Sequence, residues 1–315
     1  MTLIRSRTRR VRAWPATVLA ITMILGCATA VSGGSSARPP DDPLASLLAA
    51  DRAFAAAGSG RELADAVGAM LDRDVVMLAA GAMVRGADSA VAALRGNARN
   101  AGARMTWTPI RGGVSSDGAH GFTYGYMTVT AADGATLPGK YVAYWRRGPA
   151  GWRVAAYKRA PRPSGDVSLA ERVPARPPPG LSSYSDAELA RARQALQGAE
   201  RDFCRMAQSD GFAAAFEHWA AEDAAHVGGP GDAEFRFGPA AIGAGFGGPL
   251  PPGVTVTWIA EDALVARSGD LGITFGTITT TQAATAGQPA QERRVPYFTI
   301  WRRAGPAAPW RYVIE

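Results

Sequence analysis

The sequence predicts an α+β protein of two cone-shaped domains, each with about three N-terminal helices packed on a curved antiparallel sheet. Three observations predict it: an internal repeat, the order of helix and strand patterns within each copy, and a glycine inside the longest strand of each copy. The chain of 315 residues has room for two domains.

The repeat runs through almost the whole chain after its first forty residues. The aligned segments are residues 51–54 with 200–203, Asp74 with Asp223, Trp107 with Trp258, and 115–125 with 266–276. The residue numbers of aligned positions differ by 149 for the first two segments and by 151 for the others. This difference changes only where glycine and proline cluster, which is where insertions in loops are tolerated. We therefore expect a first domain over residues 44–160 and a second over 185–315.

Each copy begins with helix patterns. In the first copy Asp42 provides an N-cap before Pro43, and in the second Ser185 and Glu188 form a capping box. The first helix then has a mostly apolar face made by Leu44, Leu47, Leu48, Asp51 and Phe54. A second helix is expected over 61–71 and 211–220, followed in each copy by a short strand, a turn and a third short helix.

Strand patterns complete each copy. They lie near residues 104–111, 120–130, 139–147 and 151–158, and again near 254–266, 271–281, 294–303 and 310–314. Because no helix pattern separates them, we expect an antiparallel sheet. Gly125 and Gly276 lie at equivalent points within the longest strand, where glycine often marks a bulge or bend. Such a sheet would curl over the helices and leave a hollow at its open end.

The segments outside the repeat predict export and a linker. Residues 1–30 resemble a signal peptide, with five arginines before an apolar run that is too short to span a membrane. Cys27 follows Gly26 as in a bacterial lipobox, whereas residues 28–30 offer an ordinary cleavage site. Residues 31–43 would be a tether, and the six prolines of residues 161–184 predict an extended linker rather than a packed element. We expect a periplasmic protein or a membrane-anchored lipoprotein of a bacterium, with membrane attachment only through a lipid on Cys27.

Charge and motifs exclude several classes of protein. Without the five arginines of the signal peptide the formal charge of +7 falls to +2, so the mature chain has no general electrostatic reason to bind nucleic acid. Phosphate-binding loops, dinucleotide fingerprints, paired-cysteine motifs and serine elbows are absent from the sequence, and no cofactor is expected. Cys204 lies in a helical pattern, as a small core residue would.

The end of each copy carries a resemblance to a known family. The residues that carry it are Lys140-Tyr141-Val142, Trp145-Arg146 and Trp152-Arg153, with Tyr297, Trp301-Arg302 and Trp310-Arg311 in the second copy, which lacks the lysine. With the order of elements, they resemble the SnoaL-like branch of the nuclear transport factor 2-like superfamily, and more narrowly its ketosteroid isomerase-homologue domains of unknown function. The resemblance implies a cone with a cavity and no particular reaction. Steroid isomerases use an aspartate at the end of the first strand as the base; the matching positions are Ala79 and Gly228, so that reaction is not expected.

A few polar side chains are candidates for chemistry. His226, on the first strand of the second copy, is a candidate general base with Asp223 or Glu234 to orient it, although a histidine that only bonds a backbone carbonyl is the simpler interpretation. His218, Glu222 and His226 have helical spacing, but the pattern changes to strand between the last two, so no metal site is expected. His120 lies in a predicted solvated turn.

Aromatic residues on the strands are candidates for the cavity walls. We expect a ligand pocket to be lined by Trp107, Tyr124, Tyr126, Tyr141, Trp258, Phe275 and Tyr297. The alternative is that these rings form the core itself.

Three function classes follow. The first is a protein that binds a small apolar or aromatic molecule in a cone cavity. The second is an enzyme, a hydrolase, lyase or isomerase, that uses His226. The third is an interaction module whose sheets pair, within the chain as an internal pseudo-dimer or between chains as a homodimer.

Overall fold

The computed structural model describes residues 42–315 apart from residues 80, 174, 176–182, 285–286 and 288. The predicted signal peptide, Cys27 and nearly all of the predicted tether lie outside the described residues. Among the helices that the structure describes, none combines the length and the apolar character needed to cross a membrane.

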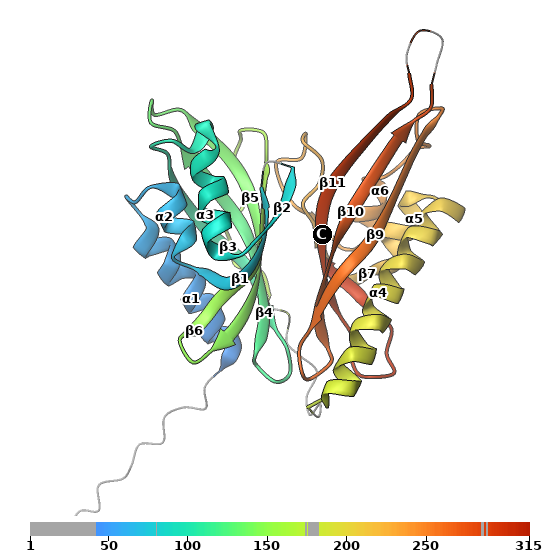
Figure 1. Ribbon diagram of the computed structural model, residues 1–315, viewed down its shortest axis with the longest axis horizontal. Coiled ribbons are helices and arrows are strands. Elements are labelled where there is room, and N and C mark those ends of the chain that lie inside the picture. The colour runs from blue at the N-terminus through green and yellow to red at the C-terminus, as the bar shows by residue number, and fades with distance from the viewer. Residues whose placement is uncertain (1–41, 80, 174, 176–182, 285–286, 288) are drawn as a thin grey trace, which may run out of the picture. The chain divides into compact units, whose positions relative to one another are not determined.

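The described chain contains two halves that share one succession of α-helices and strands, with a short 3-10 helix in the first half only (Figure 1). The first half, residues 42–161, contains α1 (Pro43–Gly58), α2 (Leu63–Gly68), β1 (Leu71–Ala79), β2 (Ala82–Arg85), α3 (Ala87–Gly96), the short 3-10 helix η1 (Ala98–Asn100), β3 (Arg104–Val114), β4 (His120–Thr130), β5 (Thr136–Gly148) and β6 (Gly151–Pro161). The second half, residues 183–315, contains α4 (Asp186–Ser209), α5 (Phe212–Trp219), β7 (Ala220–His226), β8 (Arg236–Phe237), α6 (Pro239–Ala244), β9 (Val254–Val265), β10 (Leu271–Gln282), β11 (Gln291–Arg302) and β12 (Arg311–Ile314).

Each half has one six-stranded sheet, and the predicted α+β class is confirmed. The strand orders are β2-β1-β6-β5-β4-β3 and β8-β7-β12-β11-β10-β9, so the two halves share one topology. The expected antiparallel run of the last four strands is confirmed in both halves. Each sheet is nevertheless mixed, because β1 pairs in parallel with β6 and β7 pairs in parallel with β12. A helix and a long connection lie between β2 and β3, and a crossover of this kind lets the last strand return beside the first in the same direction.

The predicted helix starts are confirmed. The Asp42 side chain accepts hydrogen bonds from the backbone N–H groups of Leu44, at 3.0 Å, and Ala45, at 3.3 Å. Ser185 and Glu188 form the reciprocal capping box at the start of α4. These caps satisfy N–H groups that the first turn of a helix leaves free.

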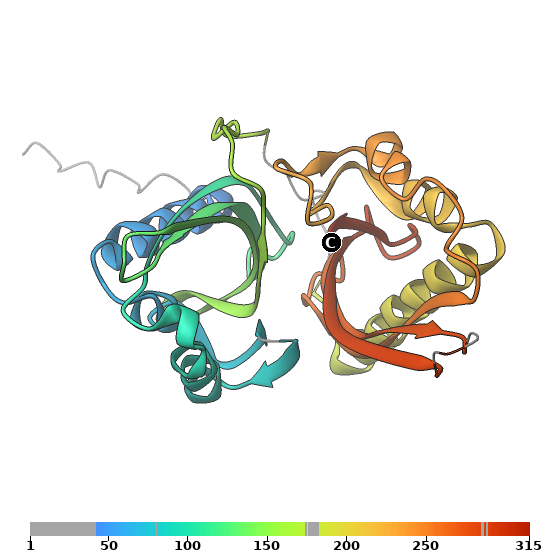
Figure 2. The ribbon, with the colours of Figure 1, turned by 90° about the horizontal axis from the view of Figure 1, so that it is seen from above.

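Both predicted strand glycines lie opposite a bulge. The register of β3 against β4 shifts between Pro109 and Arg111, opposite Gly125, and that of β9 against β10 shifts at Gly276. A Cβ atom on Gly125 would lie 2.0 Å from the Thr108 carbonyl oxygen, so only glycine permits this approach. Figure 2 shows each sheet curled around the helices of its own half.

Two described residues between the halves, Arg172 and Ala175, contact the first half. The backbone N–H of Arg172 donates to the Ile110 carbonyl at 2.7 Å, and that of Ala175 donates to the Gly112 carbonyl at 3.0 Å. These residues therefore pack on the free edge of β3, which corrects the expectation of an unpacked linker at this point. The domain boundaries at 44–160 and 185–315 stay predictions.

Candidate functional site

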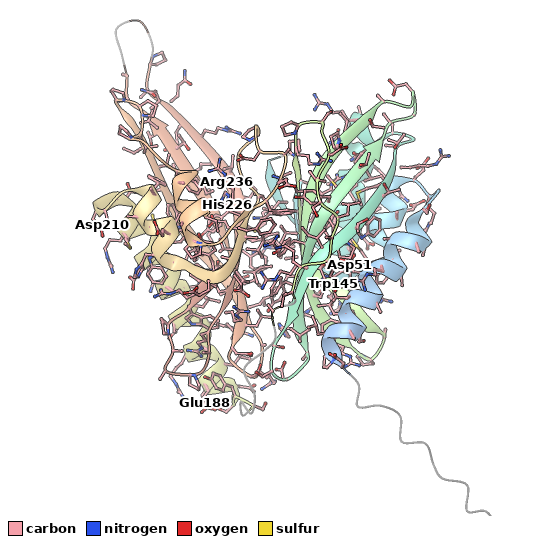
Figure 3. All side chains as sticks on the ribbon, turned by 180° about the vertical axis from the view of Figure 1, so that it is seen from behind. Asp51, Trp145, Glu188, Asp210, His226 and Arg236 are labelled. Atoms are coloured by element: carbon pink, nitrogen blue, oxygen red, sulfur yellow. The ribbon has the colours of Figure 1, made fainter. Side chains whose placement is uncertain are left out.

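A buried carboxylate lies inside the first half. Asp51 on α1 is 0% exposed; one of its oxygens accepts a hydrogen bond from Trp107 Nε1 and the other from Tyr141 Oη, each at 2.8 Å. Burial raises the pKa of Asp51, against the lowering effect of these hydrogen bonds. Figure 3 shows Asp51 close to Trp145, whose indole N–H donates to Thr123 Oγ1 at 2.8 Å. The carboxylate thus joins the first helix to strands β3 and β5.

The second half repeats this arrangement around Glu200 on α4. One oxygen of Glu200 accepts from Trp258 Nε1 at 2.7 Å and the other from Thr274 Oγ1 at 2.6 Å. Trp301 Nε1 donates to the same Thr274 hydroxyl at 3.0 Å. Burial raises the pKa of Glu200 to about 7. Both carboxylates are sealed behind aromatic rings, so they are placed to hold helix on sheet rather than to meet a substrate.

The predicted pocket aromatics divide between the two faces of their sheets. Side chains alternate along a strand, and Thr123 and Thr274 point inward to the buried cluster of their half. Their neighbours Tyr124 and Phe275 therefore point outward, and so does Tyr126, two residues beyond Tyr124. This placement corrects the expectation that these three rings line a cone interior.

The outward rings of the first half contact the second half. The Tyr124 ring centre lies 5.0 Å from that of Phe235, and Tyr126 Oη accepts from the Phe235 N–H at 3.4 Å. Tyr126 and Trp107 also line a pocket of about 290 Å³ beneath residues 162–169. The inward residues of the predicted set are Trp107, Tyr141, Trp258 and Tyr297. Their role in ligand binding stays a prediction.

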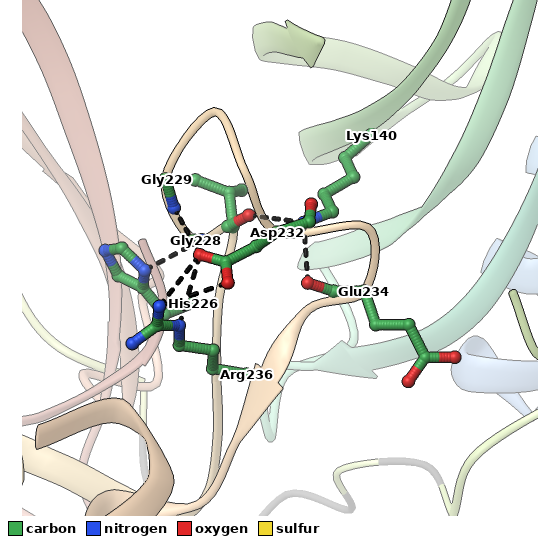
Figure 4. Close-up of polar contacts among 8 residues, drawn as sticks. Lys140, His226, Gly228, Gly229, Asp232, Glu234 and Arg236 are labelled. Atoms are coloured by element: carbon green, nitrogen blue, oxygen red, sulfur yellow. Dashed lines mark hydrogen bonds and ion pairs between the residues drawn. The ribbon is translucent and has the colours of Figure 1, made fainter. Parts of the chain in front are cut away.

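His226 lies at the end of β7 and is held as a neutral ring. Its Nδ1 accepts from the Gly228 N–H at 2.9 Å, as Figure 4 shows. The ring packs edge-on against Phe216 and Phe246, with centre distances of 5.7 and 5.1 Å. Burial lowers the pKa of His226 to about 3. A base with so low a pKa, whose Nδ1 is already occupied, is poorly placed to take a proton near neutral pH.

The predicted partners of His226 lie elsewhere, so the expected base and its orienting acid are not brought together. Asp223 pairs with Arg111 and, at 2.6 Å, with Arg302. A carboxylate oxygen of Glu234 accepts from the Ser168 N–H at 3.3 Å. The histidine is oriented by backbone instead.

The structure also bears on the spacing of His218, Glu222 and His226 and on the surroundings of His120. Helix α5 ends at Trp219, so the change from helix to strand falls between His218 and Glu222, one step earlier than expected. Within the described residues, no three His, Cys, Asp or Glu side chains are grouped so as to hold a metal ion. The expectation that His120 is solvated is wrong: its Nδ1 lies 2.8 Å from Tyr144 Oη, and burial lowers its pKa to about 4.

A small pocket opens between the end of β1, helix α3 and the ends of β4, β5 and β6; we call it the mouth pocket. Its volume is about 220 Å³, and it is lined by Leu78, Ala79, Ala93, Leu94, Asn97, Asn100, Met127, Val129, Leu137, Pro138, Arg159, Ala160 and Pro161. Most of these side chains are apolar. The wall includes Ala79, the position that matches the isomerase base.

Arg159 is the one charged side chain among the residues that line the mouth pocket. It lies opposite Tyr141 in the β5–β6 ladder, and Tyr141 points inward to Asp51. One terminal nitrogen of Arg159 lies 4.0 Å from the Met105 sulfur. The pocket thus combines an apolar wall with a guanidinium group.

A larger groove of about 860 Å³ is lined by Ser168, residues 170–173 and Ala175, and by both halves. Its charged groups largely satisfy one another, since Arg111 and Arg302 share Asp223. The guanidinium of Arg172 stacks 3.6 Å from the centre of the Phe237 ring. Several charged side chains of the groove are therefore already engaged within the chain and are less available to a ligand.

Comparison with known proteins yields matches among solved structures, while no protein-family model and no curated protein matches the chain. An NTF-2-like protein of unknown function from Shewanella oneidensis MR-1 is 14% identical with a TM-score of 0.32, covering 37% of this chain and 98% of its own. A ketosteroid isomerase-like protein from Erwinia carotovora atroseptica SCRI1043 is 22% identical with a TM-score of 0.31, covering 38% of this chain and 97% of its own. A protein of unknown function with a cystatin-like fold from Nostoc punctiforme PCC 73102 is 14% identical with a TM-score of 0.31, covering 40% and 95%.

The order and pairing of the strands in each half agree with the cone fold that the sequence resemblance implies. The roles of individual residues have to come from the geometry of this chain.

Sequence reasoning missed the two buried carboxylates and Arg159 as site residues. Asp51 already stood out as an acid on the apolar face of its helix, and Glu200 aligns with it in the repeat. Arg159 gave a weaker signal, because a terminal arginine on a strand is more often solvated.

Proposed function

We propose that the first half binds one small apolar ligand, about the size of a single aromatic ring, in the mouth pocket. The observation that carries this proposal is the mostly apolar pocket of about 220 Å³ at the open end of the sheet. An apolar protein cavity of roughly 150 Å³ is large enough for benzene, so this volume leaves room for one substituted ring. It lies just below the range of about 300–1,000 Å³ that is usual for drug-sized ligands.

Binding is favoured over catalysis because the pocket wall offers no proton acceptor. Its lining residues include no Asp, Glu or His, and alanine occupies the position of the isomerase base. Asp51 is sealed behind Trp107 and Tyr141. The neutral His226 belongs to the other half.

The second half supports ligand binding less well, because aromatic rings fill its interior. The ring of Phe203 lies 4.8 Å from Phe216, 4.9 Å from Trp258 and 5.7 Å from Tyr312, measured between centres. Such spacing is that of close-packed rings in a core.

The test uses a pair of neighbouring alanines on α3. Ala93 lines the mouth pocket, whereas Ala92 is exposed and does not. With methyl-labelled methionine, toluene should shift the signal of Met127, a wall residue, in the wild type and in Ala92→Phe. In Ala93→Phe the new ring fills the pocket and the shift should vanish. Toluene that leaves Met127 unchanged in the wild type, or that still shifts it in Ala93→Phe, would sink the proposal.

We also propose that the two halves form an internal pseudo-dimer through their sheets. Equivalent loops exchange hydrogen bonds in both directions, which supports this idea. The Ser116 N–H donates to an Asp270 carboxylate oxygen at 3.0 Å, and the Ser268 N–H donates to an Asp117 carboxylate oxygen at 2.9 Å. Light scattering after size-exclusion chromatography should then give the mass of one chain, because the pairing faces are used internally; a dimer mass would contradict this.

Export, with or without a lipid on Cys27, is a further proposal that rests on the sequence of residues 1–30. Intact mass spectrometry of protein from its own cell envelope would test it. A product that keeps its N-terminal arginines would refute export.

A further inference from the structure

We infer that the ligand of the mouth pocket carries a carboxylate that pairs with the guanidinium of Arg159. This inference rests on the proposed function and narrows its ligand to small acids with an apolar body. Benzoate is the simplest aromatic member of that class.

The direction of Arg159 follows from the ladder of β5 and β6. Arg159 lies opposite Tyr141, whose hydroxyl donates to Asp51 inside the first half. The next residue back, Lys158, points to the opposite face, where its Nζ donates to the Phe298 carbonyl of the second half at 3.0 Å. The alternation of a strand therefore sends Arg159 inward, towards Met105 and the pocket.

The guanidinium of Arg159 lacks a strong partner. It carries five N–H donors, yet among the described residues its polar contact is the weak one to the Met105 sulfur at 4.0 Å. Within the part of the chain that the structure describes, no ion pair includes Arg159, and no acid lines its pocket. A half-buried charge against an apolar wall is costly unless something pairs with it.

Three other half-buried arginines are paired with an acid within the chain. Arg146 meets Asp72 at 2.7 Å, Arg302 meets Asp223 at 2.6 Å, and Arg236 meets Asp232 at 3.0 Å. Arg311, which has no ion pair among the described residues, lies over the Trp219 ring, 5.6 Å from its centre. Arg159 lies on a pocket wall, with neither an acid nor an aromatic ring beside its guanidinium among the described residues. An anion from outside would supply the missing partner.

A carboxylate fits this position best. Its two oxygens match the planar fork of a guanidinium, which accounts for the frequency of such pairs in binding sites. The apolar lining would take the rest of the ligand, and about 220 Å³ accommodates one ring with one small substituent.

The test compares benzoate with benzamide, which has nearly the same shape and no charge, by calorimetric titration of the full chain. Wild type should bind benzoate about ten-fold more tightly or better, a difference of roughly 1.4 kcal/mol. Arg159→Gln should bind benzamide as the wild type does and lose the preference. Arg61→Gln, which removes an exposed arginine elsewhere in the first half, should keep the preference for benzoate. In the wild type, higher salt should reduce the ratio of benzoate to benzamide affinity only slightly, because the pocket is partly closed to solvent.

The possible results separate the two proposals. Equal affinity for both compounds in the wild type overturns the carboxylate inference and leaves the apolar pocket standing. A preference for benzoate that survives in Arg159→Gln also overturns it, because another group would then hold the anion. Binding of neither compound overturns both proposals. If Arg159→Gln does not fold, Arg159→Lys keeps the charge without the fork, and it should show a reduced but measurable preference; a preference as large as that of the wild type would count against the paired geometry.

Discussion

At the scale of single residues, each half buries one carboxylate, Asp51 in the first and Glu200 in the second. An acid on the inward face of the first helix is removed from water and is paired with indole and hydroxyl donors instead of a cation. Hydrogen bonds of this kind offset the cost of burying a polar group, and they make both partners depend on each other. Asp51 and Glu200 are therefore expected to matter for stability.

Asp51→Ala should destabilise the protein strongly. It leaves Trp107 Nε1 and Tyr141 Oη buried without their acceptor, at about 1–3 kcal/mol for each orphaned group. The free energy of unfolding, measured by urea denaturation, should fall by roughly 2–5 kcal/mol. Asp210→Ala, at the exposed end of α4 in Figure 3, should change it by less than about 0.5 kcal/mol. Equal effects of the two substitutions would show that the buried hydrogen bonds contribute nothing.

Glu200 should make stability depend on pH. Burial raises its pKa from 4.5 to about 7, so the folded state favours the protonated form. Below pH 4.5 the acid is protonated in both the folded and the unfolded state, so its burial costs no free energy of unfolding through ionisation. The free energy of unfolding then falls as pH rises from 4.5 to about 7, and above pH 7 the full decrease of roughly 3 kcal/mol or less is reached. Glu200→Gln mimics the protonated acid and should flatten this part of the profile. A difference between wild type and Glu200→Gln that is the same at pH 4.5 and pH 8 would contradict the raised pKa.

The sequence could show the acid on the helix face but not its partners. The donors to Asp51 lie 56 and 90 residues further along the chain, so they depend on strand register and on which way each strand faces. His226 shows the same limit: the pattern placed it correctly on a strand, and only the fold shows that Asp223 and Glu234 point elsewhere.

At the scale of elements, local signals predicted more than long-range ones did. Caps, strand alternation and the two bulge glycines were all visible in the sequence, because each depends on neighbouring residues. The parallel pairing of β1 with β6 and the packing of Arg172 and Ala175 on β3 were not visible, because both join segments that are far apart in the chain.

Gly125→Ala tests the bulge directly. The new Cβ would lie 2.0 Å from the Thr108 carbonyl oxygen, which is backbone and cannot turn aside. The register of β3 and β4 would have to change, so the melting temperature should fall by several degrees, for a cost of about 1–3 kcal/mol or more. Gly148→Ala, where a Cβ meets nothing within 4 Å, is the matched control and should melt close to the wild type. A Gly125→Ala protein that melts with the control would mean that the bulge is not required.

At the scale of the described chain, the two halves are joined asymmetrically. Lys140 is 1% exposed on the outer face of β5, and its Nζ donates to the carbonyls of Val227, Asp232 and Glu234, at 2.6, 2.8 and 2.6 Å (Figure 4). Burial lowers the pKa of Lys140 to about 8. The second copy has Pro296 at the matching position, so no equivalent bond is made in return. One ammonium group thus bonds to three carbonyls of the segment between β7 and β8.

Lys140→Met should release that turn while leaving both sheets folded. Three part-buried carbonyls lose their shared donor. An unpaired buried polar group costs about 1–3 kcal/mol, so local opening should become easier by a factor of ten or more. Hydrogen exchange followed by mass spectrometry should show faster exchange in residues 227–234 and unchanged exchange in β3–β5. Arg61→Met, which removes a charge from an exposed loop, serves as the control and should leave residues 227–234 as protected as in the wild type. If Lys140→Met keeps the protection of the turn, then the turn is held by its own contacts, such as the Asp232–Arg236 ion pair at 3.0 Å, and the lysine is not what fastens it to the first half.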